Sequence, residues 1–262
     1  MKLIKILMYR LMNDYFMRSR LSEYETLIVK SKQKGFEHLT VSEWHRALIS
    51  GTLPKKVIIH RHDIDTDIRT ARKMHKVEQK QGVNSTFYFR LSTLDARLIR
   101  EIDASSSEVG YHFEEVAQFC KDNGVKEAVV ANDSMGKIRE IFETNLQGLR
   151  ERFDCEFSSV AAHGDFVNRK LKLPSTLLLN EDLKQQLNIL CEGYDDHLMA
   201  SADIYIRDMQ YPVFYSPVSF LEALDKNNVI YFTTHPRQWE TNVLVNTWDN
   251  LKRLFEGIRW AM

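Results

Sequence analysis

The stretch Val57-Ile-Ile-His-Arg-His-Asp-Ile-Asp65 decides the fold that this sequence predicts. An apolar run of strand type ends in two carboxylates, Asp63 and Asp65. Alternate side chains of a strand share a face, so both carboxylates point together beyond its carboxyl end, where loops of α/β folds form a pocket. Carboxylates this close repel one another unless a cation or a shared proton intervenes, so the pair predicts half of a metal site. A structural role, in which this segment caps the next helix, stays open at this point.

Composition is that of an ordinary globular chain. It has 262 residues, 44% hydrophobic and 27% charged, which is enough for one large α/β domain. Lys+Arg and Asp+Glu both number 36, and this balance gives no sign of a nucleic-acid footprint. Three cysteines without paired-ligand spacing, Cys120, Cys155 and Cys191, predict reduced thiols of a cytoplasmic protein.

The first two dozen residues predict an amphipathic helix with basic residues. Lys5 interrupts the apolar stretch, and Tyr9-Arg10 and Asn13-Asp14 end it without the small-residue cleavage site of a signal peptide. No stretch reaches the length of a transmembrane helix, so we expect no integral membrane segment. We expect the helix to pack on the domain, with attachment to a membrane surface as the alternative.

Strands and helices are predicted to alternate. Strands are expected at 56–62, 85–90, 108–112, 157–163, 188–191, 203–207 and 229–234, and helices at 3–32, 41–50, 67–81, 94–104, 114–121, 133–152, 217–226 and 246–260. Ser42 is the expected cap of the helix at 41–50. The alternation favours parallel βα units, hence an α/β open sheet or barrel. No linker composition divides the chain, so we expect one domain, 1–262, with a helical extension at 1–50 packed on the barrel.

Histidines end three of the later strands, at His112, His163 and His235. If the strands are parallel, these imidazoles converge with Asp63 and Asp65 on one mouth. A single such histidine is more often structural, but several at successive strand ends favour a functional site. A carboxylate with two neutral imidazoles is a common catalytic set for a divalent ion. Zinc suits these ligands, and iron, cobalt or manganese stay open.

Five motifs, in order along residues 56–240, resemble those of the NodB-type polysaccharide deacetylases, in particular a divergent branch with RHDVD and EIGYHYE sequences. They are Arg61-His-Asp-Ile-Asp65, Ser85-Thr-Phe-Tyr-Phe-Arg90, Glu108-Val-Gly-Tyr-His112-Phe-Glu114, His163-Gly164 and Thr234-His-Pro-x-x-Trp239. The resemblance implies a distorted (β/α) barrel of the polysaccharide deacetylase type, with the helix at 246–260 following it. It also implies metal-dependent hydrolysis of N- or O-acyl groups on sugars.

The resemblance also implies roles for single residues. Asp63 would act as general base, and Asp65 would bind one divalent metal ion, for which zinc is favoured. His112 matches the first histidine of the family's His-x-x-x-His motif, and His235 matches the late histidine that protonates the leaving amine. Trp239 would wall the pocket. We expect Arg61 to shape the sugar-binding pocket with it.

One position departs seriously from the family pattern. The second histidine of His-x-x-x-His should stand at 116, where this chain has Val116, which cannot bind metal. We expect His163 to supply the third ligand, because Gly164 leaves room for a close approach. Glu114 or Glu115 is the alternative, as is a weak or absent metal. The family's arginine-proline motif is also missing.

Three functions are compatible with the sequence. The first is a metal-dependent N- or O-deacetylase that acts on a sugar or glycan precursor in cell-surface polysaccharide biosynthesis. The second is an amidohydrolase-type hydrolase with His60 and His62 as metal ligands. The face of the first strand that lines the pocket discriminates between these two. The third is a non-catalytic glycan-binding relative, which Val116 supports best.

Overall fold

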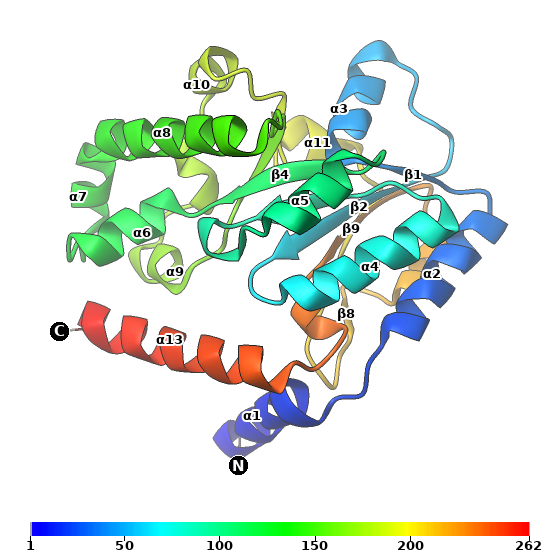
Figure 1. The fold of residues 1–262 in the computed structure, drawn as a ribbon, viewed down its shortest axis with the longest axis horizontal. Helices are drawn as coiled ribbons and strands as arrows, with labels where there is room; N and C mark the ends of the chain where they lie inside the picture. Colours follow the sequence, from blue (N-terminus) through cyan, green and yellow to red (C-terminus); the bar gives the residue numbers. More distant parts are fainter. Residues whose placement is uncertain (1, 262) are drawn as a thin grey trace.

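The computed structural model describes residues 2–261, which form a curled sheet surrounded by helices (Figure 1). Its strands are β1 (Glu37–Leu39), β2 (Val57–Ile64), β3 (Thr86–Phe89), β4 (Glu108–Phe113), β5 (Ser159–Ala162), β6 (Cys191–Glu192), β7 (Ile204–Asp208), β8 (Tyr215–Ser216) and β9 (Val229–Thr234). They run in the order β6-β5-β4-β3-β2-β9-β7-β8, with β1 paired to β2. Among residues 2–261 these strands pair in parallel, except for β7 with β8, which are antiparallel.

The helices precede the first strand, occupy connections between strands and follow the last strand. They are α1 (Lys2–Leu11), α2 (Leu21–Gln33), α3 (Val41–Ser50), α4 (Ile68–Gln81), α5 (Ala96–Asp103), α6 (Glu115–Asp122), α7 (Ala128–Asp133), α8 (Met135–Phe153), α9 (Phe166–Leu171), α10 (Glu181–Gln186), α11 (Asp196–Ser201), α12 (Phe220–Lys226) and α13 (Val243–Ala261). No helix of residues 2–261 is both long enough and apolar enough to cross a membrane. The three cysteines are free.

Strand β2 lies in the middle of the sheet, and every one of its residues is buried. It pairs with β1 and β3 on one side and with β9 on the other. Parallel strands covered on both faces read as continuous apolar runs, which is why Val57-Ile-Ile was recognisable from the sequence. Because its neighbours are parallel, the carboxyl ends of β2, β3, β4, β5 and β9 lie at one end of the sheet.

The sheet curls so far that side chains from its two sides meet. The hydroxyl of Tyr231 on β9 donates to the carbonyl oxygen of Gly193, just after β6 (2.9 Å). The ring of Tyr194, just after β6, and that of Tyr205, on β7, have centroids 6.3 Å apart. Strands β6 and β7 are far apart in the sheet order, so these contacts close its interior like an open barrel. The predicted α/β class and distorted (β/α) barrel are confirmed by this topology.

Helix ends follow the capping chemistry of the sequence, with one correction. Asp67 caps α4 through the backbone N–H of Thr70, and Gly82 ends the helix in a left-handed conformation. For α3 the cap is Thr40 and not Ser42, because Thr40 and Glu43 form a reciprocal capping box. Thr40, just before the first residue of the helix, has the extended backbone that a cap requires.

The N-terminal region differs most from expectation. The predicted helix at 3–32 is α1, a π-helical turn (Met12–Phe16) and a separate α2. Helix α2 packs into the core, but the apolar side chains of α1 from residue 4 to residue 11 are exposed. Helix α1 touches the domain near its end, where Arg10 donates to Asn250 and the ring of Tyr9 meets that of Tyr211, but its apolar side chains are not buried there. Strands β1 and β8 and helices α7, α9, α10 and α11 were not predicted, because two to six residues give too little periodicity.

Candidate active site

The predicted residues at the ends of β2, β4, β5 and β9 meet in one place. Nε2 of His112 lies 3.5 Å from Oδ1 of Asp65 and 3.6 Å from Oδ2 of Asp63. Nε2 of His163 lies 3.5 Å from the same oxygen of Asp65. Nε2 of His235 lies 4.0 Å from Oδ2 of Asp63. All five side chains therefore share one polar site.

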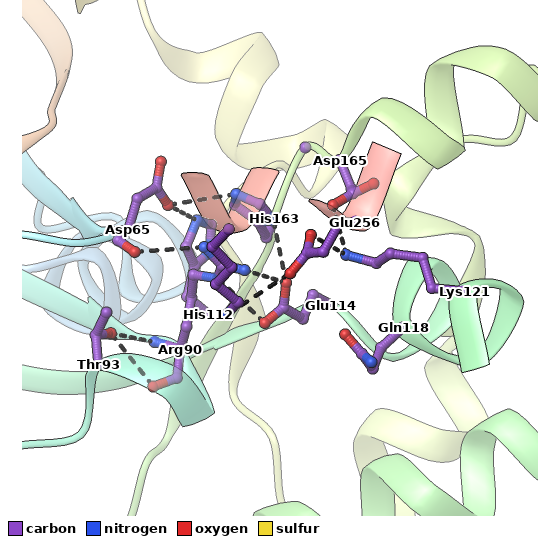
Figure 2. Close-up of polar contacts among 12 residues, drawn as sticks. Asp65, Arg90, Thr93, His112, Glu114, Gln118, Lys121, His163, Asp165 and Glu256 are labelled. Carbon is purple, nitrogen blue, oxygen red and sulfur yellow. Dashed lines mark hydrogen bonds and ion pairs between the residues drawn. The ribbon is translucent and has the colours of Figure 1, made fainter. Parts of the chain in front are cut away.

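Asp65, His112 and His163 form a group that fits a divalent ion. Their ligand atoms all lie within 4.8 Å of one another, and Figure 2 shows both imidazoles turned toward Asp65. Donors bonded to zinc at about 2.0–2.1 Å in a tetrahedron lie roughly 3.3 Å apart, close to the 3.5 Å from Asp65 to each histidine. Oδ1 of Asp65 is buried without a hydrogen-bond partner, as expected of an atom meant for a cation.

The backbone fixes the tautomer of His112 that a metal ligand needs. Its Nδ1 lies 2.9 Å from the carbonyl oxygen of Ala161, which only accepts, so Nδ1 carries the proton. Nε2 then presents its lone pair to Asp65 and the site. Metal-binding histidines commonly use such a partner on the second ring nitrogen. Burial alone would raise the pKa of Asp65, but the neighbouring imidazoles hold it well below the usual range.

The residues near position 116 do not offer a better third ligand. Val116 is 3% exposed and packs in the hydrophobic core against the sheet, away from the site. Glu114 forms an ion pair with Arg90, and its Oε2 lies 3.5 Å from Nδ1 of His163. Glu115 is buried against Tyr111 and accepts from the Glu114 backbone N–H. The geometry therefore favours His163 as ligand and Glu114 as the group that orients it.

A second group of possible ligands shares His163 but is already paired. Glu114, His163 and Asp165 lie within metal-binding reach of one another. Glu114 is neutralised by Arg90, and Asp165 by Nζ of Lys121 at 3.0 Å (Figure 2). A cation there would have to displace two formed ion pairs, so we assign the candidate metal site to the group that contains Asp65.

Arg61 holds Asp63 from below. Its Nε and Nη2 donate to the two carboxylate oxygens at 2.6 and 2.9 Å, and its Nη1 donates to the hydroxyl of Tyr231. Burial opposes ionisation of Asp63, but the charge of Arg61 outweighs it and lowers the pKa of Asp63. Arg61 itself has no exposed surface. The expectation that Arg61 shapes the sugar pocket is therefore wrong, because it contacts Asp63 and aromatic rings instead.

His235 is paired with a carboxylate that the sequence interpretation missed. Its Nδ1 donates to Oδ1 of Asp208 at 2.7 Å, and its backbone N–H donates to the other oxygen. Burial lowers the pKa of His235, but Asp208, Asp65 and Asp63 raise it to about 10. The raised pKa favours the charged imidazolium form of His235, which can donate a proton. Asp208 ends β7, so the strand-end pattern that identified the histidines could also have identified it.

Trp239 supports this pair and does not wall the pocket. It is fully buried, and its Nε1 donates to Oδ2 of Asp208 at 3.0 Å. Its ring lies against Tyr24, with centroids 5.1 Å apart, and beneath the guanidinium of Arg20. The expected contact with a sugar is not possible for a side chain without exposed surface. Trp239 belongs to the core that fixes Asp208.

The site opens into two cavities that share Asp65. One of about 510 Å³ is lined by Asp63, Asp65, Asp208 and His235. Its rim carries four guanidinium groups, those of Arg10, Arg207, Arg237 and Arg253. The other, about 450 Å³, extends past Asp65 and His163 and shares Arg10 and Arg253. The candidate base and acid thus border a space open to a ligand.

His60 and His62 lie on the opposite face of β2. Both are buried, at 1% and 0% exposure, and with Glu78 they form a group within metal-binding reach. Glu78 already accepts from the hydroxyl of Ser85, 2.7 Å away, and lies 2.6 Å from Nε2 of His62. Neither histidine lines the two cavities at the strand ends. The amidohydrolase-type alternative is therefore not supported, because its ligands would have no access to substrate.

Comparisons with known proteins add little to this geometry. No protein-family model matches the chain, and no curated protein sequence matches it. Among solved structures, a deacetylase of Streptococcus pyogenes in complex with acetate is similar over 64% of this chain and 69% of its own. The TM-score is 0.42 at 15% sequence identity. This likeness is too distant to assign an activity, so the function must come from the side chains of the site.

Proposed function

We propose that this protein is a metal-dependent deacylase that removes an N- or O-acyl group from a sugar or glycan precursor. One observation carries the proposal. The candidate metal ligands Asp65, His112 and His163 lie next to two groups of opposite character. These are Asp63, whose pKa is lowered, and His235, whose pKa is raised, and Oδ2 of Asp63 lies 4.0 Å from Nε2 of His235. Such opposed protonation states are what an acid and a base of one hydrolysis need.

Each residue has a defined task in this scheme. A divalent ion held by the three ligands would supply a Lewis acid that polarises the acyl carbonyl and acidifies water. Asp63 accepts the proton of the attacking water, and Arg61 keeps it ionised and aimed at the cavity. His235 protonates the leaving nitrogen or oxygen, and Asp208 keeps it charged. Water thus hydrolyses the acyl bond and yields one carboxylic acid and one amine or alcohol.

The rival function is a relative that binds glycans without chemistry. A binding site gains little from burying Arg61 and Asp208 only to hold single carboxylate and imidazole groups. Charged groups placed at such a cost are typical of catalytic sites. We therefore favour catalysis, and as part of the same proposal we assign it to cytoplasmic assembly of cell-surface polysaccharide.

Acetate release tests this function. Purified protein would be incubated with N- and O-acetylated mono- and disaccharides, before and after chelation, and with zinc, cobalt or manganese restored. The expected result is release that chelation abolishes and one of these ions restores. Glu181→Gln, at a side chain 89% exposed on α10, is the matched control and should behave as wild type. Stoichiometric metal without hydrolysis of any substrate would favour the binding protein.

A further inference from the structure

Helix α13 shows its apolar side to solvent and its polar side to the protein. Its outer stripe of large apolar side chains is exposed, from Leu244 at 81% and Trp248 at 73% to Phe255 at 66%. Its inner side carries Asn246, which is buried and donates to the backbone of Asp14 at 2.9 Å. A surface helix of a globular protein has the reverse arrangement. The stripe therefore needs an explanation outside the fold.

Helix α1 lies next to α13 (Figure 1), and it too carries exposed apolar side chains. Arg10 at its end donates to the side chain of Asn250 on α13 at 2.9 Å. The residues of 4–16 and 243–258 with large exposed apolar side chains are Ile4, Ile6, Leu7, Met8, Tyr9, Leu11, Met12, Phe16, Val243, Leu244, Trp248, Leu251, Leu254, Phe255 and Ile258. An apolar patch built from two adjacent helices is typical of an interaction surface.

The charge of the two helices selects the partner. Helix α1 contains no acidic residue. The acidic residues of α13 are both paired: Asp249 with Arg237 and Arg253, and Glu256 with Lys121. The exposed charged side chains of the two helices are all basic: Lys5, Arg10, Lys252, Arg253 and Arg259. Arg253 pairs with Asp249 and Lys252 with Glu256, so these five cations still outnumber the two acidic residues of the helices. Apolar side chains flanked by cations suit an anionic lipid surface, where the stripe enters the acyl boundary and the cations meet the headgroups.

We propose that α1 and α13 together form a docking surface for an anionic membrane. This surface is continuous with the candidate active site, because Arg10 on α1 and Arg253 on α13 line both cavities. Docking therefore places the opening of the site next to the lipid headgroups. It does not depend on the proposed hydrolysis and can be tested without a substrate.

Tryptophan fluorescence reports docking directly. Trp248 is 73% exposed, whereas Trp44 and Trp239 have no exposed surface and Trp260 is half-buried against the core. Vesicles of phosphatidylcholine mixed equally with phosphatidylglycerol should shift the emission to shorter wavelength, and Trp248→Phe should remove the shift. Vesicles of phosphatidylcholine alone should give a weaker response. Salt should weaken binding to the anionic vesicles, because it screens the basic residues.

Sedimentation with the same vesicles separates the stripe from general stickiness. Leu7→Glu and Leu244→Glu should each weaken binding by roughly tenfold or more, since each replaces a leucine that the membrane would bury with a charged side chain. Ile49→Glu, at 71% exposure on α3, is the matched control and should bind as wild type. Absence of binding to anionic vesicles would overturn the proposal. Binding by Leu7→Glu and Leu244→Glu as strong as that of Ile49→Glu would also overturn it. So would the finding that the stripe joins two copies of the chain and does not bind vesicles.

Discussion

Arg61 and Asp63, two residues apart on one strand, form a two-pronged ion pair with donor–acceptor distances of 2.6 and 2.9 Å. Arg61 has no exposed surface, and Asp63 is only 3% exposed, on the cavity side. The ion pair fixes the candidate base, Asp63, at the mouth of the site.

Arg61→Met should destabilise the protein by about 3 kcal/mol, because it leaves the buried charge of Asp63 unpaired. Denaturant unfolding measures this loss. The double variant Arg61→Met with Asp63→Asn should recover much of it, since the unpaired charge is gone. Equal stability of the single and double variants would show that the ion pair does not carry the effect.

Gly193→Ala should disturb Asp63 indirectly, by displacing Arg61. A Cβ at Gly193 would lie 2.7 Å from Nη1 of Arg61 and 3.2 Å from the hydroxyl of Tyr231. Such overpacking costs about 1–3 kcal/mol and moves the guanidinium, so both stability and kcat should fall. Gly136→Ala, where a Cβ meets nothing within 4 Å, is the control and should be neutral or stabilising. Wild-type kcat in Gly193→Ala would mean that Arg61 tolerates displacement.

Asp208→Asn should change the pH dependence of the protein. In wild type the pKa of His235 is raised from its model-compound value of 6.5 to about 10, so proton binding by His235 stabilises the fold. This contribution is complete below pH 6.5 and is lost as the pH rises through about 10. Removing the Asp208 charge should shrink the loss and move the basic limb of the rate profile to lower pH. Thermal unfolding and kcat across this range check both effects, and unchanged profiles would contradict them.

His163→Ala should lose stoichiometric metal, as should Asp65→Ala and His112→Ala. Adding Val116→His to His163→Ala should not restore it, because Val116 packs in the core and a histidine there points away from Asp65. Metal analysis of the purified variants decides. Metal regained in the double variant would place the third ligand at 116, as the family pattern has it, and would refute the assignment of His163.

Much of this site was predictable because it sits on parallel strands. Once β2, β4, β5 and β9 were recognised, their last residues had to meet, and Asp65, His112 and His163 do so. The roles of Arg61 and Trp239 were not predictable, because the sequence does not show on which side of an element a large side chain packs. Arg61 stands between His60 and His62 in the sequence, yet its side chain points into the interior and reaches the site only through Asp63.

Other errors concern short strands and the apolar faces of the two terminal helices. Strand β8 has two residues and therefore no periodic signal. It nevertheless pairs antiparallel with β7, the strand that positions Asp208. The sequence predicted the helix at 246–260 but not its exposed apolar stripe, since a hydrophobic pattern gives the apolar face of a helix and not what covers that face. The same limit misled the expectation for α1.

The central claim is that Asp63 performs the chemistry and does not hold the metal. Asp63→Asn keeps the shape of the side chain and the three candidate ligands, so its metal content should equal that of wild type. Its kcat for acetate release should fall by about 10²–10⁴-fold, the usual range for removal of a general base. The most direct measurement is therefore kcat together with metal content in this one variant. A metal-loaded Asp63→Asn with wild-type kcat would contradict the account.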